Sequence, residues 1–333
     1  MIYTGIDISK DFFDVAIPKT KGYQSHQYEN QMAGFEALLA VMPPNAHCVM
    51  EATGPYYLRL ATYLYQQGIP VSVVNPLVIG PQTRVSTGVK RFSQMKLSRA
   101  KTDKADAKLI ADYGHLHQPQ AWHPPVAFIE QVGQEQSLLA QLIKQRTAFQ
   151  NHRHALLQHP HPSEKALQSL ETLLEQLDEQ IKELEESIAQ QSQAHCAPLL
   201  EVLTSIPGIG PKTAIHLLVI TRCFERFENS KQLSAYIGLA PRLYQSGSSV
   251  RGKVHIAKLG MAKMRSLLYM CAWTASQHNQ ACKELYQRLL AKGKAKKLAL
   301  IAVANKLLKQ AFAIATTLTP YRATQSKQNL GLA

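Results

Sequence analysis

The sequence predicts an α/β domain that is followed by a mostly helical remainder. Three observations indicate this: strand and helix signals alternate over the first 120 residues, a heptad repeat of leucine and isoleucine follows, and basic helical segments end the chain. A length of 333 residues suits two domains and a third, smaller element. We therefore divide the chain into an α/β domain at residues 1–125, a helical arm at 126–195 and a helical C-terminal domain at 196–325.

The elements of the first domain are those of a mixed sheet. Five segments have the alternating or β-branched pattern of strands: residues 2–8, 12–18, 23–28, 47–52 and 70–74. Helical periodicity lies between them at residues 35–42 and 53–67, with Thr53 as the expected N-cap of the second helix. Three early strands and then helix, strand, helix and strand are typical of a mixed sheet. Residues 79–100 are rich in glycine, serine and basic side chains and predict a long loop, after which Thr102 begins a helix.

Residues 134–191 predict long helices. A first helical stretch at 134–158 ends at the His-Pro-His-Pro sequence of residues 159–162, because proline breaks helices. A second helix begins at Ser163 and carries apolar residues at heptad spacing: Leu167, Leu170, Leu174, Leu177, Ile181, Leu184 and Ile188. Such a seam is buried either against the first helix or against a second copy of the chain, and the sequence alone leaves both open.

The charge of the chain is concentrated near its C-terminus. The net charge is +14, yet residues 1–250 carry 22 basic and 22 acidic side chains, whereas residues 251–333 carry 15 basic residues and one acid, Glu284. A local excess of this size favours a polyanionic partner, and nucleic acid is the leading class.

Composition also argues against several classes of protein. No apolar run reaches the roughly 20 residues of a membrane span, and the N-terminus has no signal-peptide pattern. The five cysteines are dispersed and form no Cys-x-x-Cys pair, which argues against a zinc ribbon and against a disulfide framework. We expect a cytoplasmic protein without a membrane partner.

Four carboxylates stand where an α/β fold gathers functional groups. Asp7 and Glu51 come at the ends of predicted strands, and Asp103 and Asp106 are three residues apart, which places both on one face of a helix. Strand ends that lie side by side, with a helix packed across them, would bring the four into one pocket. Such oxygen ligands suit Mg²⁺ or Mn²⁺, and two ions about 4 Å apart activate a nucleophile and stabilise a leaving oxygen at a phosphodiester. The alternative is that Asp103 and Asp106 are surface residues or N-caps.

A glycine-rich motif opens the C-terminal domain. Residues 206–212, Ile-Pro-Gly-Ile-Gly-Pro-Lys, resemble the hairpin of helix-hairpin-helix DNA binders. In that setting Gly208 and Gly210 expose backbone N–H groups to a phosphate, and Lys212 adds positive charge. The alternative is a plain glycine-rich connection between helices.

A serine-rich segment follows at residues 241–252. Three serines surround Gly247, and Arg242 and Arg251 flank them. A serine nucleophile held in this way attacks a phosphate while the arginines neutralise charge. From its chemistry alone, the segment is more simply interpreted as a loop.

Together, these motifs resemble one known family. The sequence contains Asp7 in GIDISK, Glu51 in EATG, Asn75-Pro76, KTDKADA at 101–107, SIPGIGPKTA at 205–214 and YQSGSSVRG at 244–252. Their kind and order are similar to those of the DEDD-type insertion-sequence transposases, a family that includes the pilin-gene DNA invertase and the bridge-RNA-guided recombinases. The resemblance covers nearly the whole chain.

The resemblance implies a fold and a mechanism. The first domain would be RuvC-like, of the ribonuclease H fold, with Asp7, Glu51, Asp103 and Asp106 as catalytic ligands of Mg²⁺ or Mn²⁺. In the C-terminal transposase domain, Ser246 would form a transient phosphoserine link to DNA, so that cut strands are exchanged and rejoined without ATP.

The resemblance also implies partners. The arm at residues 126–195 would be a coiled coil that joins copies of the chain into a dimer or tetramer. A non-coding guide RNA would pair with donor and target DNA, in the cytoplasm of a bacterium or archaeon, beside the nucleoid.

Contacts with nucleic acid are expected from two glycines and a set of basic residues: Lys101, Lys104, Gly208, Gly210, Lys212, Arg242, Arg251, Lys253, Lys258, Lys263 and Arg265. One departure from the family pattern lies between Asn75 and Lys101, where the chain is about ten residues longer around residues 80–89. This extension beside the acidic residues is either tolerated or alters nucleic-acid contacts and activity.

Two other functions stay open on the sequence alone. A RuvC-like, metal-dependent nuclease would use the carboxylates with water as nucleophile and would need no serine. A non-catalytic nucleic-acid-binding protein would use the hairpin, the basic helices and the coiled coil, although the acids at the strand ends argue against it. In the favoured interpretation, Asp7→Asn and Ser246→Ala each abolish recombination and leave the fold intact.

Overall fold

A computed structural model describes most of the chain. The described residues are 1–52, 54–74, 102–242, 245–246, 250–251, 255–256 and 260–322, and within residues 241–255 only the backbone is described. The chain divides into two compact units, Met1–Pro124 and Pro125–Ala333, which we call unit 1 and unit 2 and describe separately.

Unit 1 is built on a mixed sheet. Its strands are β1 (Ile2–Ile8), β2 (Phe12–Pro18), β3 (Tyr23–Glu29), β4 (Ala46–Glu51) and β5 (Val71–Val74), in the order β3-β2-β1-β4-β5. β1 to β3 pair antiparallel, whereas β4 pairs parallel to both β1 and β5. The predicted mixed sheet is confirmed, and the strand bounds differ from the predicted segments by no more than one residue.

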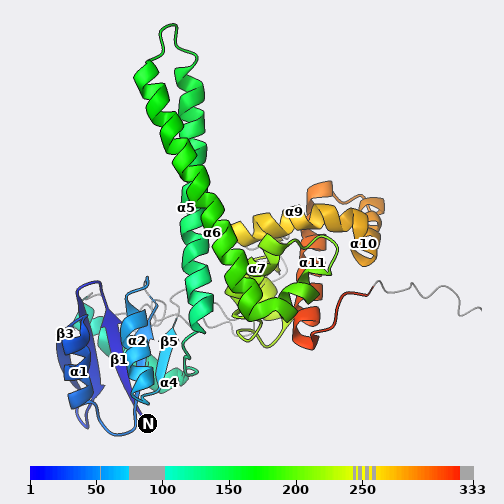
Figure 1. The fold of residues 1–333 in the computed structure, drawn as a ribbon. Helices are drawn as coiled ribbons and strands as arrows, with labels where there is room; N and C mark the ends of the chain where they lie inside the picture. The colour runs from blue at the N-terminus through cyan, green and yellow to red at the C-terminus, as the bar shows by residue number, and fades with distance from the viewer. Residues whose placement is uncertain are drawn as a thin grey trace, which may run out of the picture. The chain divides into compact units, whose positions relative to one another are not determined.

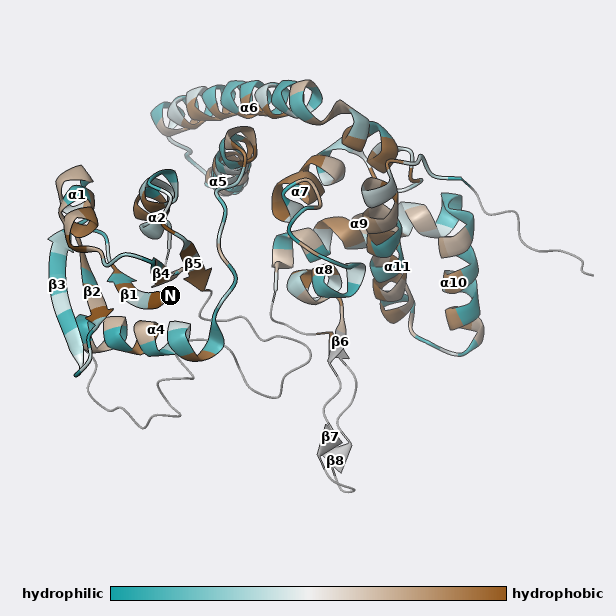
Figure 2. Ribbon diagram, turned by 90° about the horizontal axis from the view of Figure 1, so that it is seen from below, coloured by the Kyte–Doolittle hydropathy of each residue, from teal (hydrophilic) through white to brown (hydrophobic). Residues whose placement is uncertain are grey.

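Helices cover both faces of this sheet (Figure 2). The helices α1 (Met32–Val41) and α2 (Tyr57–Gln66) pack on one face, where Ile6, Phe35 and Leu60 are fully buried. The helix α4 (Asp103–His117) packs across the other face, over a smaller cluster that includes Tyr3 and Val49. Alternate residues of β1 therefore point to α1 and α2, or to α4.

Two helix starts differ in how well the sequence predicted them. The helix predicted from Thr102 is confirmed as α4: Thr102 is its N-cap, and its Oγ1 accepts a hydrogen bond from the Ala105 N–H at 3.3 Å. The second helix was predicted from Thr53, which lies outside the described residues, and α2 instead begins at Tyr57. Gly54 has a φ of 69°, a left-handed conformation that interrupts a helical backbone.

The chain leaves unit 1 along the edge of the sheet. The Trp122 N–H donates to the Val71 carbonyl of β5 at 2.6 Å. The buried Ser72 hydroxyl lies 2.8 Å from the carbonyl oxygens of Pro119 and of Gln120. The segment before the unit boundary is thus anchored to β5.

Unit 2 begins with two long helices, α5 (Ala127–Leu156) and α6 (Glu164–Thr204). They lie side by side as an antiparallel hairpin (Figure 1). Ion pairs join Arg146 to Asp178 and, at 3.2 Å, Arg153 to Glu171, so partner numbers fall along α6 as they rise along α5. The seven heptad residues of α6 are buried or half-buried in this single chain, which answers the question that the sequence left open: the seam pairs within the chain.

The remainder of unit 2 is a helical bundle. Its helices are α7 (Pro211–Thr221), α8 (Ser230–Ile237), α9 (Ala262–His278), α10 (Gln280–Ala291) and α11 (Lys296–Thr317). They share one core with the last turns of α6, which bends at Cys196, where the backbone leaves helical geometry two residues before Pro198. Among the described helices, α11 is long and apolar enough to cross a membrane by length and composition alone, which the run-length argument from the sequence had not recognised. Its side chains Val303, Leu307 and Leu308 are buried in this core.

The serine-rich segment forms short antiparallel ladders. β6 (Pro241–Arg242) pairs with β9 (His255–Ile256), and β7 (Gln245–Ser246) pairs with β8 (Val250–Arg251). The sequence had favoured a loop here because a Ser-Gly-Ser-Ser string is typical of loops, and strands of two residues are too short to show a strand pattern.

Candidate functional site

The acidic residues of unit 1 gather on the face of the sheet that α4 covers. Gly5 of β1 faces α4, because a Cβ on it would lie 2.0 Å from the Ala107 carbonyl oxygen and 2.4 Å from the Ala111 nitrogen. Only glycine permits this close approach of helix and strand. Asp7 is two residues further along the same strand and therefore shares the face of Gly5.

The direction of α4 carries its first turn to Asp7. Gly114 of α4 packs against Tyr3 of β1, and one or two turns earlier Ala111 and Ala107 pack against Gly5. Continuing by one turn in the same direction places the start of α4 beside Asp7. Asp103 and Asp106 are in that first turn, the former exposed and the latter half-buried.

Glu51 comes from the neighbouring strand. β4 runs parallel to β1 with Gly5 opposite Val49, and Val49 is part of the cluster under α4. Glu51 follows Val49 by two residues, so it shares that face and stands next to Asp7. The strand ends and α4 thus bring together the four acids that the sequence had singled out.

A fifth carboxylate, which the sequence motifs did not reveal, stands beside them. Asp14 of β2 is the cross-strand partner of Asp7 and is only 3% exposed. Its Oδ2 accepts a hydrogen bond from Gln27 Nε2 at 3.1 Å, while its Oδ1 has no hydrogen-bond partner among the described residues. The available signal was an acid inside the otherwise apolar strand Phe-Phe-Asp-Val-Ala-Ile-Pro, since a buried carboxylate requires partners.

The gathering of these acids changes the protonation of Asp7. Burial is the first cause that raises the pKa of Asp7 from 3.8 to about 6, and the negative charges of Asp106, Asp103, Glu51 and Asp14 raise it further, in that order. Like charges this close disfavour one another's ionised form. Part of the Asp7 population is therefore protonated near neutral pH when no cation balances the cluster.

The donor set suits a hard divalent cation. Carboxylate oxygens are the ligands of Mg²⁺ and Mn²⁺, and mutual repulsion on Asp7 is the electrostatic condition that a cation relieves. In the described part of the chain, no three acidic, histidine or cysteine side chains stand in a metal-binding arrangement. The chemistry of the residues fits the ion, whereas their present side-chain positions do not complete a site.

The second candidate centre lies in unit 2. Ser246 of β7 is opposite Val250 of β8, and Gln245 is opposite Arg251. Arg242 belongs to the adjoining ladder of β6 and β9, where it is opposite His255. The backbone therefore arranges the serine and both arginines on one pair of short ladders, although their side chains are not described.

The two glycines of the glycine-rich motif have different surroundings: Gly208 is required for packing, and Gly210 is exposed. Gly208 has a φ of 107°, and a Cβ there would lie 2.8 Å from the Cys271 carbonyl oxygen of α9, so glycine is required for packing. Gly210 is exposed, a Cβ added to it would meet nothing within 4 Å, and it directly precedes the first residue of α7. Gly210 and the start of α7 are thus the part of the hairpin that a phosphate can approach.

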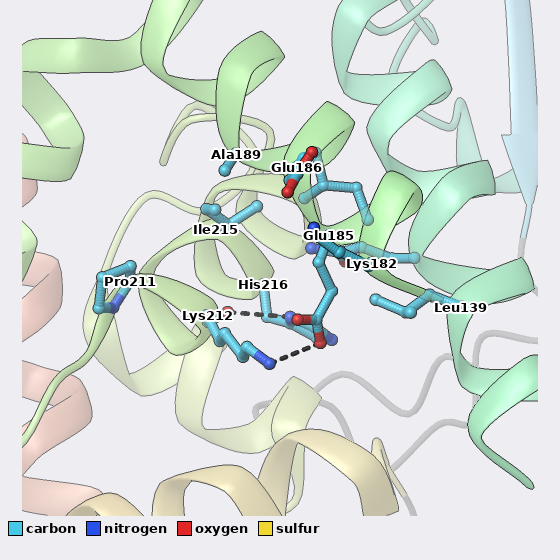
Figure 3. Close-up of a pocket in the computed structure, with 11 residues that line it drawn as sticks. Leu139, Lys182, Glu185, Glu186, Ala189, Pro211, Lys212, Ile215 and His216 are labelled. Carbon is cyan, nitrogen blue, oxygen red and sulfur yellow. Dashed lines mark hydrogen bonds and ion pairs between the residues drawn. The ribbon is translucent and has the colours of Figure 1, made fainter. Parts of the chain in front are cut away.

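Lys212 in the same hairpin already has an acidic partner (Figure 3). Its Nζ lies 2.6 Å from Glu185 Oε1 of α6, and its side chain is 77% exposed. The two residues line a mostly apolar cavity of about 360 Å³ between α5, α6 and α7. The His216 Nδ1–H donates to the Lys212 carbonyl at 3.0 Å, and burial, followed by the charge of Lys263, lowers the pKa of His216.

The other expected nucleic-acid contacts differ in their surroundings. Lys263 is exposed at the start of α9 near His216, and Lys104 is exposed in the first turn of α4. Arg265 instead donates from Nη1 to the Ile237 carbonyl at 3.0 Å, at the C-terminal end of α8, which gives part of its guanidinium a structural role. Lys101, Lys253 and Lys258 lie outside the described residues, as do Asn75-Pro76 and the extension at residues 80–89.

Comparisons with known proteins found two matching family models and several relatives. A family model for DEDD-type IS110 transposases matches residues 4–162, and a model for the transposase IS116/IS110/IS902 family matches residues 200–287. The pilin gene-inverting proteins of Moraxella lacunata and Moraxella bovis are each 32% identical over 332 residues, 96% of this chain and 97% of the relative. The transposase for insertion sequence element IS1111A of Coxiella burnetii is 34% identical over 121 residues, 35% of this chain and 33% of that protein.

These matches span both units and nearly the full length of two relatives. The family model that matches residues 4–162 covers the strands and α4 that carry the acidic residues. The model that matches residues 200–287 covers the glycine-rich motif and the serine-bearing ladders. The chain therefore belongs to the IS116/IS110/IS902 family of transposases, the DNA-recombining enzymes of insertion sequences.

Proposed function

We propose that this transposase cuts and rejoins DNA with two chemical centres, the carboxylate cluster of unit 1 and Ser246 of unit 2. The observation that carries the proposal is the convergence of Asp106, Asp103 and Glu51 on the half-buried Asp7. Clusters of carboxylates with a perturbed pKa are typical of active sites, since at other positions they would only lower the stability of the protein. The order of the sheet, with β1 in its centre beside β4, is compatible with a RuvC-like domain of the ribonuclease H fold.

In this proposal Asp7, Glu51, Asp103 and Asp106 hold Mg²⁺, or Mn²⁺ in its place. The ions, when bound, would stabilise the negative charge that develops on a phosphodiester under attack. The chain contributes the rigid backbone of β1 and β4 and the first turn of α4, which hold the carboxylates in place. Asp14 lies opposite Asp7 on the neighbouring strand β2 and adds to the negative charge around it, so that Asp7 favours a cation as neighbour.

Ser246 is the proposed nucleophile. Its hydroxyl oxygen attacks the DNA phosphorus and forms a phosphoserine ester, while the bond from phosphorus to the leaving DNA oxygen breaks and that oxygen takes a proton. A DNA hydroxyl of the strand to be joined then attacks the same phosphorus, and the bond to the serine oxygen breaks. Each step exchanges one phosphate ester for another, which is why no ATP is required. Arg251 on the same ladder as Ser246, and Arg242 on the adjoining ladder, would neutralise the phosphate.

The proposal includes partners. DNA is the substrate, and a non-coding guide RNA would select donor and target sequences by base pairing, with the basic residues of unit 2 contacting backbones. The hairpin of α5 and α6 would be the contact between copies in a dimer or tetramer, since paired cuts at two DNA sites require several active centres. The proposed phosphate contacts in the described part of unit 2 are Gly210 and Lys212 of the glycine-rich motif at residues 206–212, and Lys263 near them.

A covalent-trapping assay tests the proposed function. The full-length protein is incubated with Mg²⁺, DNA of its element ends and the flanking transcript, then denatured, and the protein–DNA adduct is measured. We expect an adduct with the wild type, none with Ser246→Ala, and normal yield with Ser249→Ala, a control from the same serine string. Asp7→Asn should also abolish the adduct while the variant remains folded by circular dichroism.

Each other outcome contradicts a defined part of the proposal. Metal-dependent cleavage without an adduct would show a nuclease that uses water. Tight, salt-sensitive DNA binding without cleavage or adduct would show a binding protein or an inactive copy. An adduct that persists in Ser246→Ala would move the nucleophile to another residue.

A further inference from the structure

A groove between α9 and α10 lies outside the sites described above. α10 directly follows α9 in the chain and packs against it in unit 2 (Figure 1), and the groove between them has a volume of about 340 Å³. Its walls are formed by residues at helical spacing on each helix: Trp273, Ser276, Gln277, Lys283, Tyr286, Gln287 and Leu290. One face of each helix therefore lines the groove.

Trp273 is the unusual residue of this groove. Its side chain is 57% exposed, and the neighbouring Met270, one turn earlier on α9, is 65% exposed. Tryptophan is highly buried in most proteins, and here the opposite face of α9, with Leu268, Ala272 and Ala275, makes the core. Trp273 thus presents a flat aromatic surface that the fold of this chain does not need.

The polar side chains of the groove suit a nucleotide. The amides of Gln277 and Gln287 each offer donors and an acceptor, which match the edge of a nucleobase. The Lys283 ammonium supplies a positive charge for a phosphate. No acidic side chain is among the lining residues, so nothing in the groove itself repels a polyanion.

The surface around the groove is positively charged, like Lys283 within it. Glu284 is the one acid of residues 251–333, and it accepts a hydrogen bond from Gln280 at 2.8 Å. The pKa of Tyr321 is raised first by burial, then by Cys282 and then by the negative charge of Glu284, so Glu284 faces Tyr321. Beyond Leu290, the connection to α11 and the first turn of that helix carry four exposed lysines: Lys292, Lys294, Lys296 and Lys297. The groove therefore opens onto a positive surface that is complementary to phosphates.

We propose that this groove binds an unpaired base of single-stranded DNA, with the base stacked on Trp273 and a flanking phosphate at Lys283. The base faces in a duplex are covered by their neighbours, so only an unpaired base offers a face to the indole. The inference rests on the proposed function, because exchanging strands between two DNA molecules requires open, unpaired DNA.

Intrinsic fluorescence provides a direct test. The chain has two tryptophans, so in full-length Trp122→Phe the tryptophan emission, excited selectively over that of tyrosine, comes from Trp273 alone. This protein is titrated with an oligothymidylate of about 12 nucleotides, in a chelator so that no catalysis occurs. We expect saturable quenching by the single strand, as stacking produces, and little quenching by a duplex of the same length.

Affinity measurements on variants complete the test. Trp273→Ala should weaken binding to the single strand about tenfold, which is the size of effect expected for one lost base–aromatic stack. Duplex affinity should stay within about twofold, because phosphate contacts are untouched. Trp273→Phe should keep most of the affinity. The matched control Leu298→Ala, another half-exposed apolar residue on a basic helix, should change neither affinity.

Three results would overturn the inference: no quenching, an equal loss of single-strand and duplex affinity in Trp273→Ala, or tighter Trp273-dependent binding of RNA of matching sequence. The last would assign the groove to RNA instead of DNA. The assay needs neither Mg²⁺ nor Ser246, whereas covalent trapping needs both. If the protein forms the adduct but its binding of single strands does not depend on Trp273, the inference about the groove is wrong and the proposed function stands. If binding depends on Trp273 but no adduct forms, the proposed function is wrong and the groove still binds single strands.

Discussion

The acidic residues of unit 1 place a cost on the fold. Asp7 has a folded-state pKa of about 6 against an ordinary value of 3.8. The folded protein therefore holds the Asp7 proton more tightly than the unfolded chain does. The contribution of this proton to the free energy of unfolding is therefore lost as the pH rises from about 4 to about 6, and it is gone above the folded-state pKa.

Asp7→Asn should consequently raise the stability of unit 1 at pH 7.5 and have little effect at pH 3.5. We expect a gain of about 1 kcal/mol after allowance for solvent screening, or a few degrees in Tm. Thermal unfolding of wild type and variant at both pH values measures it. Asp11→Asn, in the exposed turn between β1 and β2, is the control and should show no such difference. A variant that is less stable than wild type at pH 7.5 would contradict the assignment of charge repulsion to Asp7.

The ion pair of Lys212 predicts a variant that binds DNA more tightly. Glu185 holds the Lys212 ammonium at 2.6 Å and competes with a phosphate for it. Glu185→Gln should therefore increase affinity for duplex DNA two- to fivefold at low salt, about 1 kcal/mol or less for an exposed pair. Glu186→Gln removes the same charge from the next residue and should have a smaller effect. Equal gains from both variants would show a general charge effect and no specific competition.

Single residues differ in how far the sequence could predict them. Asp7, Glu51, Asp103 and Asp106 were visible because they stand at strand ends and at helical spacing, and their gathering follows from the parallel register of β1 and β4. Asp14 was missed because its importance depends on the cross-strand pairing of β1 and β2, which local patterns do not encode. The partners of Lys212 and Arg265 come from α6 and α8, distant in sequence, so no local signal announced them.

At the scale of elements, the close packing of α4 on β1 positions the acidic cluster. Gly5→Ala would drive a Cβ into the backbone of α4, which cannot move as a flexible side chain does. We expect unit 1 to lose about 3 kcal/mol of stability and the protein to lose recombination activity. Thermal unfolding checks the first effect and an excision assay the second.

Lys108→Ala is the matched control for α4. Lys108 is on the exposed side of the same helix, so its loss should change stability by no more than about 0.5 kcal/mol. If Gly5→Ala were as stable as this control, the close approach between α4 and β1 could not be what places Asp103 and Asp106.

Elements with strong periodicity were predicted well, and those without it were not. The strands of unit 1 alternate clearly, and their bounds match within one residue. The start of α2 was placed too early because the left-handed Gly54 is not visible in a hydropathy pattern. The two-residue strands β6 to β9 are shorter than one period of any pattern, so only their pairing defines them.

At the scale of the whole molecule, pairing of α5 with α6 changes what a contact between copies can use. The heptad seam is occupied within the chain, and the large apolar side chains left exposed on the arm are Val126, Leu138, Ile143, Leu157 and Leu173. If the arm joins copies as proposed, these residues form the contact.

Ile143→Lys combined with Leu173→Lys should therefore shift the protein from oligomer to monomer in sedimentation experiments at micromolar concentration. The control is Gln145→Lys combined with Gln176→Lys, which adds the same charge at exposed polar positions. The control should keep the oligomer. Dissociation in both would indicate charge repulsion, and dissociation in neither would place the contact elsewhere on the molecule.

The anchoring of the exit segment on β5 has a consequence for aggregation. An open sheet edge is a template on which other chains add strands. On one side, the Trp122 backbone and the Ser72 contacts cover β5, which is short, so strand addition is blocked there. On the other side, β3 keeps seven residues, and only its exposed polar side chains discourage a neighbour. Crowded or overexpressed protein should therefore begin to misassemble at β3, and a lysine placed on that strand is the change that would keep the transposase dispersed.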